Sequence, residues 1–249
     1  MQQFLKNPGL PAKPVKTVIA SPENKEIIAR LEGHYGISVL FTKPNNQIQN
    51  PISSHSDMLI THLGSEFIIL ENSQSHLKGE LERRGMSPIV SETVLSKQYP
   101  SDIAFNIILI NSTIIGLEKH MAPEIKKFAA RQQLKIRDCK QGYSRCSCAF
   151  VSNGAIITGD ATLLKIFKTM DFDVLKITNQ GILLTGYDVG FIGGCCAKLE
   201  PSVLAVTGDI GCHKDCENIK AFCRNHNVYI ESLCEGPLRD IGGIIPISY

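Results

Sequence analysis

Nine cysteines are the most reactive side chains of this sequence. Cys146 and Cys148 are two residues apart, and Cys195 and Cys196 are adjacent. A thiolate beside an acid or a base can act as a nucleophile, and the candidates for that role are Cys195, Cys196 and Cys146. If Cys146, Cys148, Cys195 and Cys196 converged, they could instead bind zinc or an iron–sulfur cluster. Their spacing matches no standard metal motif, so we favour packing as small apolar groups and predict no cofactor.

A second cluster contains Cys212, His213 and Cys216 at the predicted start of a helix. A helix N-terminus lowers the pKa of a thiol, so Cys212 could be reactive. The favoured alternative is that Cys216 and Cys223 face the core while His213 is solvated.

Polar residues also occur in or beside stretches that are otherwise apolar. Polar groups that converge in a channel are the usual sign of a ligand pocket, and Tyr143 and Tyr187 could form its walls. Because buried polar groups need partners, an equally weighted alternative is a closed network that pairs Arg145 or Arg239 with an aspartate. The candidate ligand-binding residues are Asp57, His55, Asn106, Tyr143, Arg145, Tyr187, Asp188, Arg239 and Asp240.

The elements that would position these residues repeat four times as strand, turn, strand, helix and strand. A fixed period of this kind is typical of repeat architectures. The last two copies each begin with Gly-Tyr and end their second strand with Thr-Gly-Asp, whose aspartates, Asp160 and Asp209, are predicted to cap helices. The predicted inner strand pairs are 56–61 with 66–70, 105–110 with 113–117, 146–151 with 155–160, and 195–199 with 203–209.

The two ends of the sequence complete the repeat. Residues 16–41 read as strand, helix and strand without an inner strand, and residues 242–248 read as a strand with no helix after it. If the second segment pairs with the first, five units form a closed ring with no exposed sheet edge. The predicted fold is therefore α/β, a pseudo-fivefold propeller closed by its C-terminal strand. One domain is predicted over residues 1–249, with units near 16–50 plus 242–248, 51–100, 101–141, 142–185 and 186–235.

The composition is that of an ordinary globular protein, with 43% hydrophobic and 20% charged residues and a net charge of +2. No basic stripe predicts a nucleic-acid partner, and no apolar run approaches the about 20 residues of a membrane span. The first residues lack the apolar region of a signal peptide, so a cytoplasmic location with reduced thiols is expected. The sequence leaves the oligomeric state open.

This architecture resembles the pentein fold. Its members include enzymes that modify guanidino groups: dimethylarginine dimethylaminohydrolase, arginine deiminase, agmatine deiminase and the amidinotransferases. Another member is a translation factor without enzymatic activity, which keeps the ribosomal subunits apart. The resemblance covers nearly the whole sequence, rests on the repeat and a few short motifs, and implies a bacterial branch of the fold.

The resemblance also implies roles for individual positions. Asp57 matches the acid with which the enzymes grip a guanidinium, through charge-assisted hydrogen bonds. The general-base histidine of the enzymes would open the fourth unit, but residues 142–146 read Gly-Tyr-Ser-Arg-Cys. Their nucleophilic cysteine would lie at Pro246 or Ile247. The covalent thiouronium route of the family therefore lacks its nucleophile at the usual position.

Three functions remain open, and the sequence does not decide whether the protein is an enzyme. The first is binding of a small polar, cationic or amino-acid-like molecule in the axial channel, with Asp57 on the cation and Asn106, Arg145 and Arg239 on the rest. The second is a guanidino or amidine hydrolase, or an amidinotransferase, with a displaced cysteine. The third is a non-catalytic protein-interaction factor, which rests on the fold alone.

Overall fold

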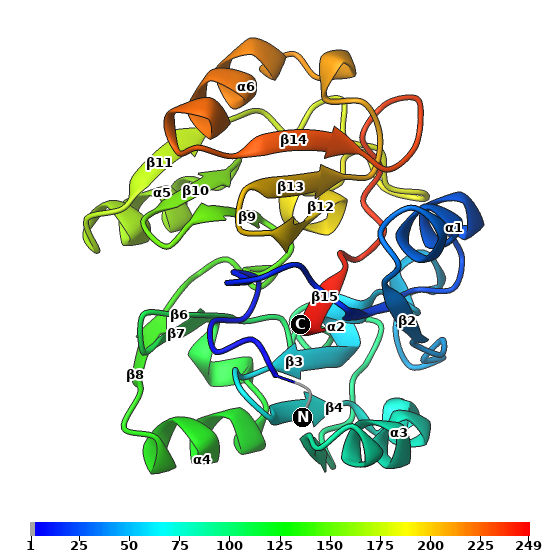
Figure 1. Ribbon diagram of the computed structural model, residues 1–249. Helices are drawn as coiled ribbons and strands as arrows, with labels where there is room; N and C mark the ends of the chain where they lie inside the picture. Colours follow the sequence, from blue (N-terminus) through cyan, green and yellow to red (C-terminus); the bar gives the residue numbers. More distant parts are fainter. Residues whose placement is uncertain (1–2) are drawn as a thin grey trace.

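A computed structural model describes residues 3–249 and arranges them as five three-stranded sheets around a central axis (Figure 1). In every sheet the inner strand is antiparallel to the middle strand, which is parallel to the outer strand. The last strand pairs with the first, through Val18 and Pro246. These pairings confirm the predicted α/β propeller and its closure by the C-terminal strand.

The sheets are β15 (Ile245–Ser248), β1 (Thr17–Ala20) and β2 (Ser38–Phe41); β3 (Ile60–His62), β4 (Phe67–Leu70) and β5 (Ser87–Val90); β6 (Ile108–Ile110), β7 (Thr113–Gly116) and β8 (Lys135–Asp138); β9 (Cys148–Ser152), β10 (Ala155–Thr158) and β11 (Asp173–Lys176); and β12 (Cys196–Glu200), β13 (Val203–Val206) and β14 (Tyr229–Ser232). No predicted unit boundary cuts a sheet, while the assignment of residues 1–249 to one domain stays a prediction.

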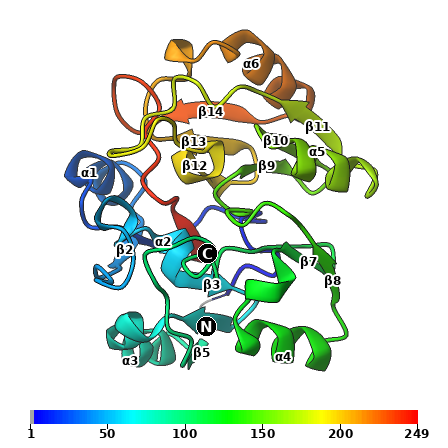
Figure 2. The same ribbon diagram turned by 180° about the vertical axis from the view of Figure 1, so that it is seen from behind.

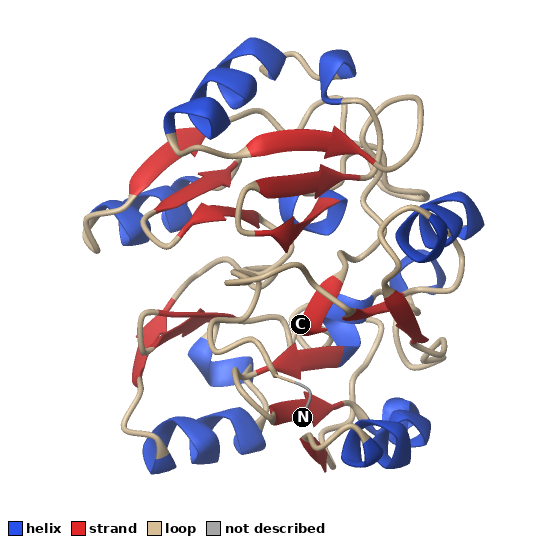
Figure 3. Cartoon of the chain, viewed as in Figure 1, coloured by secondary structure: helices blue, strands red, loops and turns tan. Residues whose placement is uncertain are grey.

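The α-helices are α1 (Lys25–Gly33), α2 (Ser56–Leu59), α3 (Lys78–Arg83), α4 (Pro123–Arg131), α5 (Ala161–Lys168) and α6 (Cys216–Asn225). All except α2 lie on the outside of the ring (Figure 3). The middle strands β7, β10 and β13 lie beneath them and are buried at every residue, as expected for strands covered on both faces. Of the helices in residues 3–249, none has the length and apolar character to cross a membrane.

The predicted helix caps are confirmed. Asp160 precedes α5, and its Oδ1 accepts hydrogen bonds from the amides of Thr162 (2.7 Å) and Leu163 (2.8 Å). Asp209 accepts from the amide of Gly211 (2.7 Å) at the short 3-10 helix Ile210–Cys212. Both carboxylates satisfy amides that have no partner within the helix, so they act structurally.

The prediction of a strand at 56–61 is wrong at its first residues. Ser56–Leu59 form α2, and only Ile60–His62 form β3. The Ser56 hydroxyl lies within hydrogen-bond distance of the carbonyl oxygens of Gly242 (2.9 Å) and Gly243 (3.0 Å). Both ribbon views show α2 beside β15 (Figures 1 and 2). Tertiary contacts to the last unit thus override the local strand preference.

The segment before β1 crosses the centre of the ring (dark blue in Figure 1). Leu5 is fully buried, and its amide donates to the carbonyl of Ile247 (3.2 Å) while its own carbonyl accepts from Ser65 (2.7 Å). Gly9 packs so closely on Phe150 that an added Cβ would lie 2.7 Å from the ring. The segment therefore covers one end of the axis.

Candidate functional site

Each inner strand is preceded by a short segment that reaches the axis; before β3 and β12 this segment is helical, as α2 and the 3-10 helix Ile192–Cys195. The residues at the axis lie two or three positions before β3, β6, β9, β12 and β15. We call them the axial ring, and in chain order they are Asp57, Asn106, Cys146, Gly193–Gly194 and Gly242–Gly243. The fold therefore brings one acid, one amide, one thiol and two glycine pairs together from five units.

The side chain of Asn106 joins the three polar members of the axial ring. Its Nδ2 donates to the carbonyl oxygen of Asp57 (3.0 Å) and to Sγ of Cys146 (2.9 Å). Its Oδ1 accepts from the amides of Arg145 (2.8 Å) and Cys146 (3.4 Å). Asn106 is fully buried, and its amide group is occupied by protein contacts, so it acts as a clamp rather than as a free ligand-binding group.

The glycine pairs complete the axial ring through their backbones. The amide of Gly193 donates to the carbonyl of Cys146 (2.6 Å), and the amide of Gly243 donates to the carbonyl of Gly194 (3.0 Å). The amide of Asp57 donates to Gly242, the first residue of the other pair (3.0 Å). A Cβ on Gly194 would overlap the carboxylate of Asp240, so a side chain cannot fit there.

A thiol and a carboxylate form a hydrogen bond at the centre. Sγ of Cys146 donates to Oδ2 of Asp57 (3.0 Å). Burial, followed by the nearby carboxylates of Asp57 and Asp240, raises the pKa of Cys146 well above its ordinary value. Oδ1 of Asp57 is buried and has no hydrogen-bond partner within residues 3–249. The centre of the axial ring thus holds a neutral thiol beside an incompletely satisfied carboxylate.

A cavity of about 140 Å³, the inner chamber, opens beside Cys146. Its polar lining consists of Cys146, His55 and Asp240. The Tyr143 ring stacks on Phe191 with centroids 5.9 Å apart, and its hydroxyl donates to Asp102 Oδ2 (2.6 Å). The apolar and aromatic lining consists of Ile52, Met58, Tyr143, Leu184, Tyr187, Val189 and Phe191.

A second cavity of about 360 Å³, the outer chamber, shares His55, Leu184 and Asp240 with the inner one. Its remaining lining is largely polar and includes Glu23, Asn24, Asn50 and Arg239. The two chambers therefore meet at a histidine–aspartate pair, with apolar walls on one side of it and polar walls on the other.

Asp240 provides the negative charge at this junction. Its Oδ2 accepts from the amide of Phe191 (2.8 Å), and its Oδ1 accepts from the amide of Gly242 (3.0 Å) and lies 3.9 Å from Nδ1 of His55. Burial raises the pKa of Asp240 to about 6; His55 opposes the rise and Asp57 adds to it. The carboxylate is therefore ionised at neutral pH and becomes neutral in mild acid.

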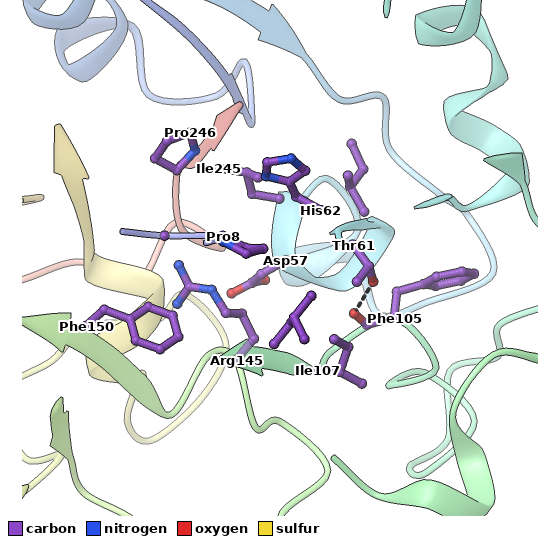
Figure 4. A pocket seen from close by; sticks show the side chains of 13 residues that line it. Pro8, Asp57, Thr61, His62, Phe105, Ile107, Arg145, Phe150, Ile245 and Pro246 are labelled. Carbon is purple, nitrogen blue, oxygen red and sulfur yellow. Dashed lines mark hydrogen bonds between the residues drawn. The ribbon is translucent and has the colours of Figure 1, made fainter. Parts of the chain in front are cut away.

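Asp57 lines a different cavity, of about 30 Å³ (Figure 4), whereas its hydrogen-bond partner Cys146 lines the inner chamber. Pro8 and Gly9 also line this far cavity, as does Arg145. Nη1 of Arg145 donates to the carbonyl of Cys148 (3.0 Å), and its guanidinium lies 5.3 Å from the centre of the Phe150 ring. Arg145 is thus separated from the two chambers.

The remaining predicted ligand residues divide between rim and surface. Tyr187 lines the inner chamber and is 42% exposed, whereas Asp188 is exposed and lies outside both chamber linings. Arg239 lines the outer chamber, with Nη2 3.8 Å from Oε2 of Glu26. Within residues 3–249 neither Arg145 nor Arg239 forms an ion pair with an aspartate, so the alternative closed network is not formed.

The candidate nucleophiles have different surroundings. Cys195 donates to the carbonyl of Phe191 (3.1 Å) and Cys196 to that of Ile192 (3.2 Å), whereas Cys146 lines the inner chamber. Cys148 packs in another apolar cluster. The four thiols proposed as metal ligands thus fall in three apolar clusters, and the described part of the chain contains no group of three or more side chains that could hold a metal ion.

The second cysteine cluster differs from the favoured interpretation at two residues. Cys216 is only partly buried and its thiol donates to a carboxylate at the surface, so the prediction that it faces the core is wrong. Cys223 is buried and Cys212 is exposed, but His213 is only 4% exposed, so the prediction that it is solvated is wrong. Its Nε2 lies 3.1 Å from the carbonyl oxygen of Thr178, and its Nδ1 accepts from the amide of Asp215 (3.0 Å). These two backbone contacts allow the imidazole to be buried.

Sequence reasoning missed the two glycine pairs of the axial ring and the apolar wall residues Leu184, Val189 and Phe191. A usable signal was the constant position of Asn106, Cys146, Gly194 and Gly243, each two residues before an inner strand. Leu184, Val189 and Phe191 carry no such signal, because they lie in the long irregular connection between β11 and β12.

Comparison with solved structures identifies the class. The saxitoxin-pathway amidinotransferase SxtG of Microseira wollei superposes with a TM-score of 0.59 and 13% identity, covering 96% of this chain and 92% of that one. The inosamine-phosphate amidinotransferase StrB1 of Streptomyces griseus gives 0.60 and 10%, covering 98% and 97%. The dimethylarginine dimethylaminohydrolase of Pseudomonas aeruginosa, solved with citrulline, gives 0.54 and 10%, covering 92% and 96%. This protein therefore has the pentein fold.

Within that class the sequence assigns the family directly. The model of the family of unknown function DUF6873 matches residues 18–245, so the chain belongs to this family. A comparison with curated proteins finds no match.

Proposed function

We propose that this protein binds a small cationic molecule of amino-acid size in the inner and outer chambers. The observation that carries the proposal is the position of Asp240, a buried carboxylate that lines both chambers. A buried anion is costly without a counter-charge, and a bound cation would provide one. His55, 3.9 Å away, is the nearest titratable partner in the junction.

Asp57 has a supporting role in this proposal. The sequence predicted that Asp57 would grip the cation, but its carboxylate lies behind Cys146 and lines the far cavity. Its charge acts on the inner chamber across the thiol, while Asp240 makes the direct contact. Arg239, at the outer chamber, is the residue placed to meet a polar or anionic substituent of the ligand.

A thermal-melt screen with amines, amino acids and guanidino compounds tests the proposal. A ligand at about a hundred times its dissociation constant stabilises the folded protein by about 2.7 kcal/mol, which is a measurable shift in melting temperature. Asp240→Asn should remove the shift, and Asp188→Asn should leave it unchanged because Asp188 lies outside both chamber linings. If no cation changes the melting temperature, the proposal fails.

A second candidate is an amidine or guanidino hydrolase, or an amidinotransferase, with Cys146 as nucleophile. The observation that favours it is that the Cys146 thiol lines the inner chamber and already donates to a carboxylate. Asp57 would take the thiol proton as sulfur attacks the amidine carbon. The leaving amine would depart with a proton, and water or a second amine would then release the carbon from sulfur.

Cys146→Ala should abolish turnover while leaving ligand binding intact. Cys195→Ala is the matched control, because this buried thiol hydrogen-bonds a backbone carbonyl and lines neither chamber. Turnover that survives Cys146→Ala would exclude this mechanism.

All nine cysteines are free thiols, which supports the proposal that the protein works in the reducing cytoplasm.

A further inference from the structure

The inner chamber has few groups that can hydrogen-bond a ligand. Seven of its ten lining residues are apolar or aromatic, and the other three are His55, Cys146 and Asp240. Of the seven, Tyr143 and Tyr187 carry a hydroxyl, and that of Tyr143 donates to Asp102. The two oxygens of Asp240 already accept one backbone amide each, and the Cys146 thiol is engaged with Asp57 and Asn106. A ligand group inside this chamber must therefore be satisfied mainly by apolar contact.

The size of the inner chamber limits that group. Its volume is about 140 Å³, close to the about 150 Å³ of an engineered apolar cavity that binds benzene. Tyr143 and Phe191 stack as one wall, and Tyr187 stands at the rim. Aromatic walls favour another ring by stacking or edge contacts.

The charge of the residues at the junction restricts the kind of polar group that the ligand can carry. The carboxylate at the junction is that of Asp240, and among residues 3–249 no lysine or arginine lines the inner chamber. A guanidinium carries five N–H donors in a plane, more than the free lone pairs of this junction accept. An ammonium is compact, carries three donors and needs fewer acceptors.

We propose that the ligand is a primary amine attached to a compact ring, of the size and chemistry of benzylamine. The ring of the ligand lies in the inner chamber, between Val189 and the wall formed by Tyr143 and Phe191. The ammonium contacts the carboxylate of Asp240. A further polar substituent would extend into the outer chamber toward Arg239. This inference rests on the proposed function, because it requires a cation at the same carboxylate.

Isothermal titration with benzylamine, benzyl alcohol, phenylacetate and agmatine tests the proposal on the purified, reduced protein. The alcohol and the acid keep the benzyl group and replace the ammonium with a neutral or an anionic group, whereas agmatine carries an ammonium and a guanidinium without a ring. We expect benzylamine to bind at least about tenfold more tightly than each of the other three, which is the effect of about one charge-assisted hydrogen bond.

Two variants separate the ring from the charge. Val189→Phe fills the inner chamber and should weaken benzylamine binding by about tenfold or more, while Val94→Phe, at a residue that is 78% exposed, should not change it. Asp240→Asn should remove the preference for benzylamine over benzyl alcohol, and Asp188→Asn should keep it. Because Val189 accepts no hydrogen bond through its side chain, its variant remains informative if Asp240→Asn fails to fold.

Each of the other possible results contradicts a specific part of the two proposals. If agmatine binds and benzylamine does not, and binding depends on Asp240, the proposed function stands and the ring inference is wrong. If benzyl alcohol binds as tightly as benzylamine, or Val189→Phe binds benzylamine like the parent, the ring inference is also wrong. If no cation binds, both proposals are wrong.

Discussion

The two faces of the axial ring differ although five similar turns build it. On one face the inner and outer chambers are about 140 Å³ and 360 Å³. On the other face the far cavity is about 30 Å³, space for one or two water molecules, and the segment with Pro8 and Gly9 covers it. Each face has its own carboxylate, Asp240 on the first and Asp57 on the second.

This difference shows where the structure departs from its pseudo-fivefold symmetry. The repeat sets the positions of the axial ring, but connections outside the repeat decide which face is open. Leu184, Val189 and Phe191, on the connection before β12, wall the inner chamber, whereas the segment before β1 closes the opposite end. We therefore expect ligands to enter from one face only, and the following experiments test that expectation.

The largest effect is expected from Gly194→Ala. A Cβ there would overlap the carboxylate of Asp240, which cannot move away without losing the amides of Phe191 and Gly242. The free energy of unfolding should fall by about 3 kcal/mol, as for other overpacked or disrupted buried sites. Urea unfolding measures it. Gly154→Ala is the control, because within residues 3–249 no heavy atom beyond its two chain neighbours lies within 4 Å of a Cβ at that position. Equal losses in both variants would contradict the packing described.

The second-largest effect is expected on ligand affinity, when each of the two carboxylates is replaced in turn. Asp240→Asn should weaken binding of a cation by about a hundredfold, corresponding to the about 2–3 kcal/mol of a charge-assisted contact with a buried ion. Asp57→Asn should weaken it by only about threefold, because Asp57 acts across the Cys146 thiol at longer range. Titration calorimetry of both variants at pH 7.5 decides the order, and a larger effect of Asp57→Asn would show that the ligand reaches the far side.

The pH dependence of binding should follow Asp240. Its pKa is raised to about 6, so the carboxylate is ionised at pH 7.5 and increasingly protonated below pH 6. A cation that needs the ionised form should bind about tenfold more weakly at pH 5 than at pH 7, since each pH unit below the pKa reduces the ionised fraction about tenfold. The groups that surround the carboxylate are His55, Asp57, Cys195 and Cys146. Affinity that does not change between pH 5 and pH 7 would remove Asp240 from the site.

The smallest effect concerns the closed face. Gly9 and Gly36 both have positive φ (76° and 63°), but only a Cβ at Gly9 would press on Phe150. Gly9→Ala should therefore cost about 1 kcal/mol more than Gly36→Ala in unfolding free energy. Its affinity for a cation should equal that of the parent protein. A change in affinity would mean that the two faces are coupled through the axial ring.

Most of the architecture can be predicted from the sequence, because apolar periodicity and turn residues mark each repeat. The helix caps formed by Asp160 and Asp209 are equally predictable, because a cap depends on neighbours within three residues along the chain. The strand expected at 56–61 fails for the opposite reason. The Ser56 hydroxyl hydrogen-bonds the carbonyls of Gly242 and Gly243, which are 186 and 187 residues away in the sequence. The Asp57 amide also donates to Gly242.

The candidate site follows the same division. Asp57, Asn106 and Cys146 are visible as polar residues next to apolar strands, and the structure joins them by hydrogen bonds. Whether a residue faces one cavity or the other depends on which side of a turn its side chain leaves. That choice separates Arg145, at the far cavity, from its neighbour Cys146, at the inner chamber, and single-sequence patterns do not encode it.

The pairing of β1 with β15 has a consequence for the order in which the protein can be made. Val18 leaves the ribosome early but cannot pair until Pro246, its partner in β15, has been synthesised. The other four sheets use strands that are close in sequence and can form during translation, whereas contacts between distant segments form late. The same late step brings Gly242–Gly243 to Asp57. A nascent chain therefore carries an incomplete axial ring and an open sheet edge until residues 242–248 have been synthesised.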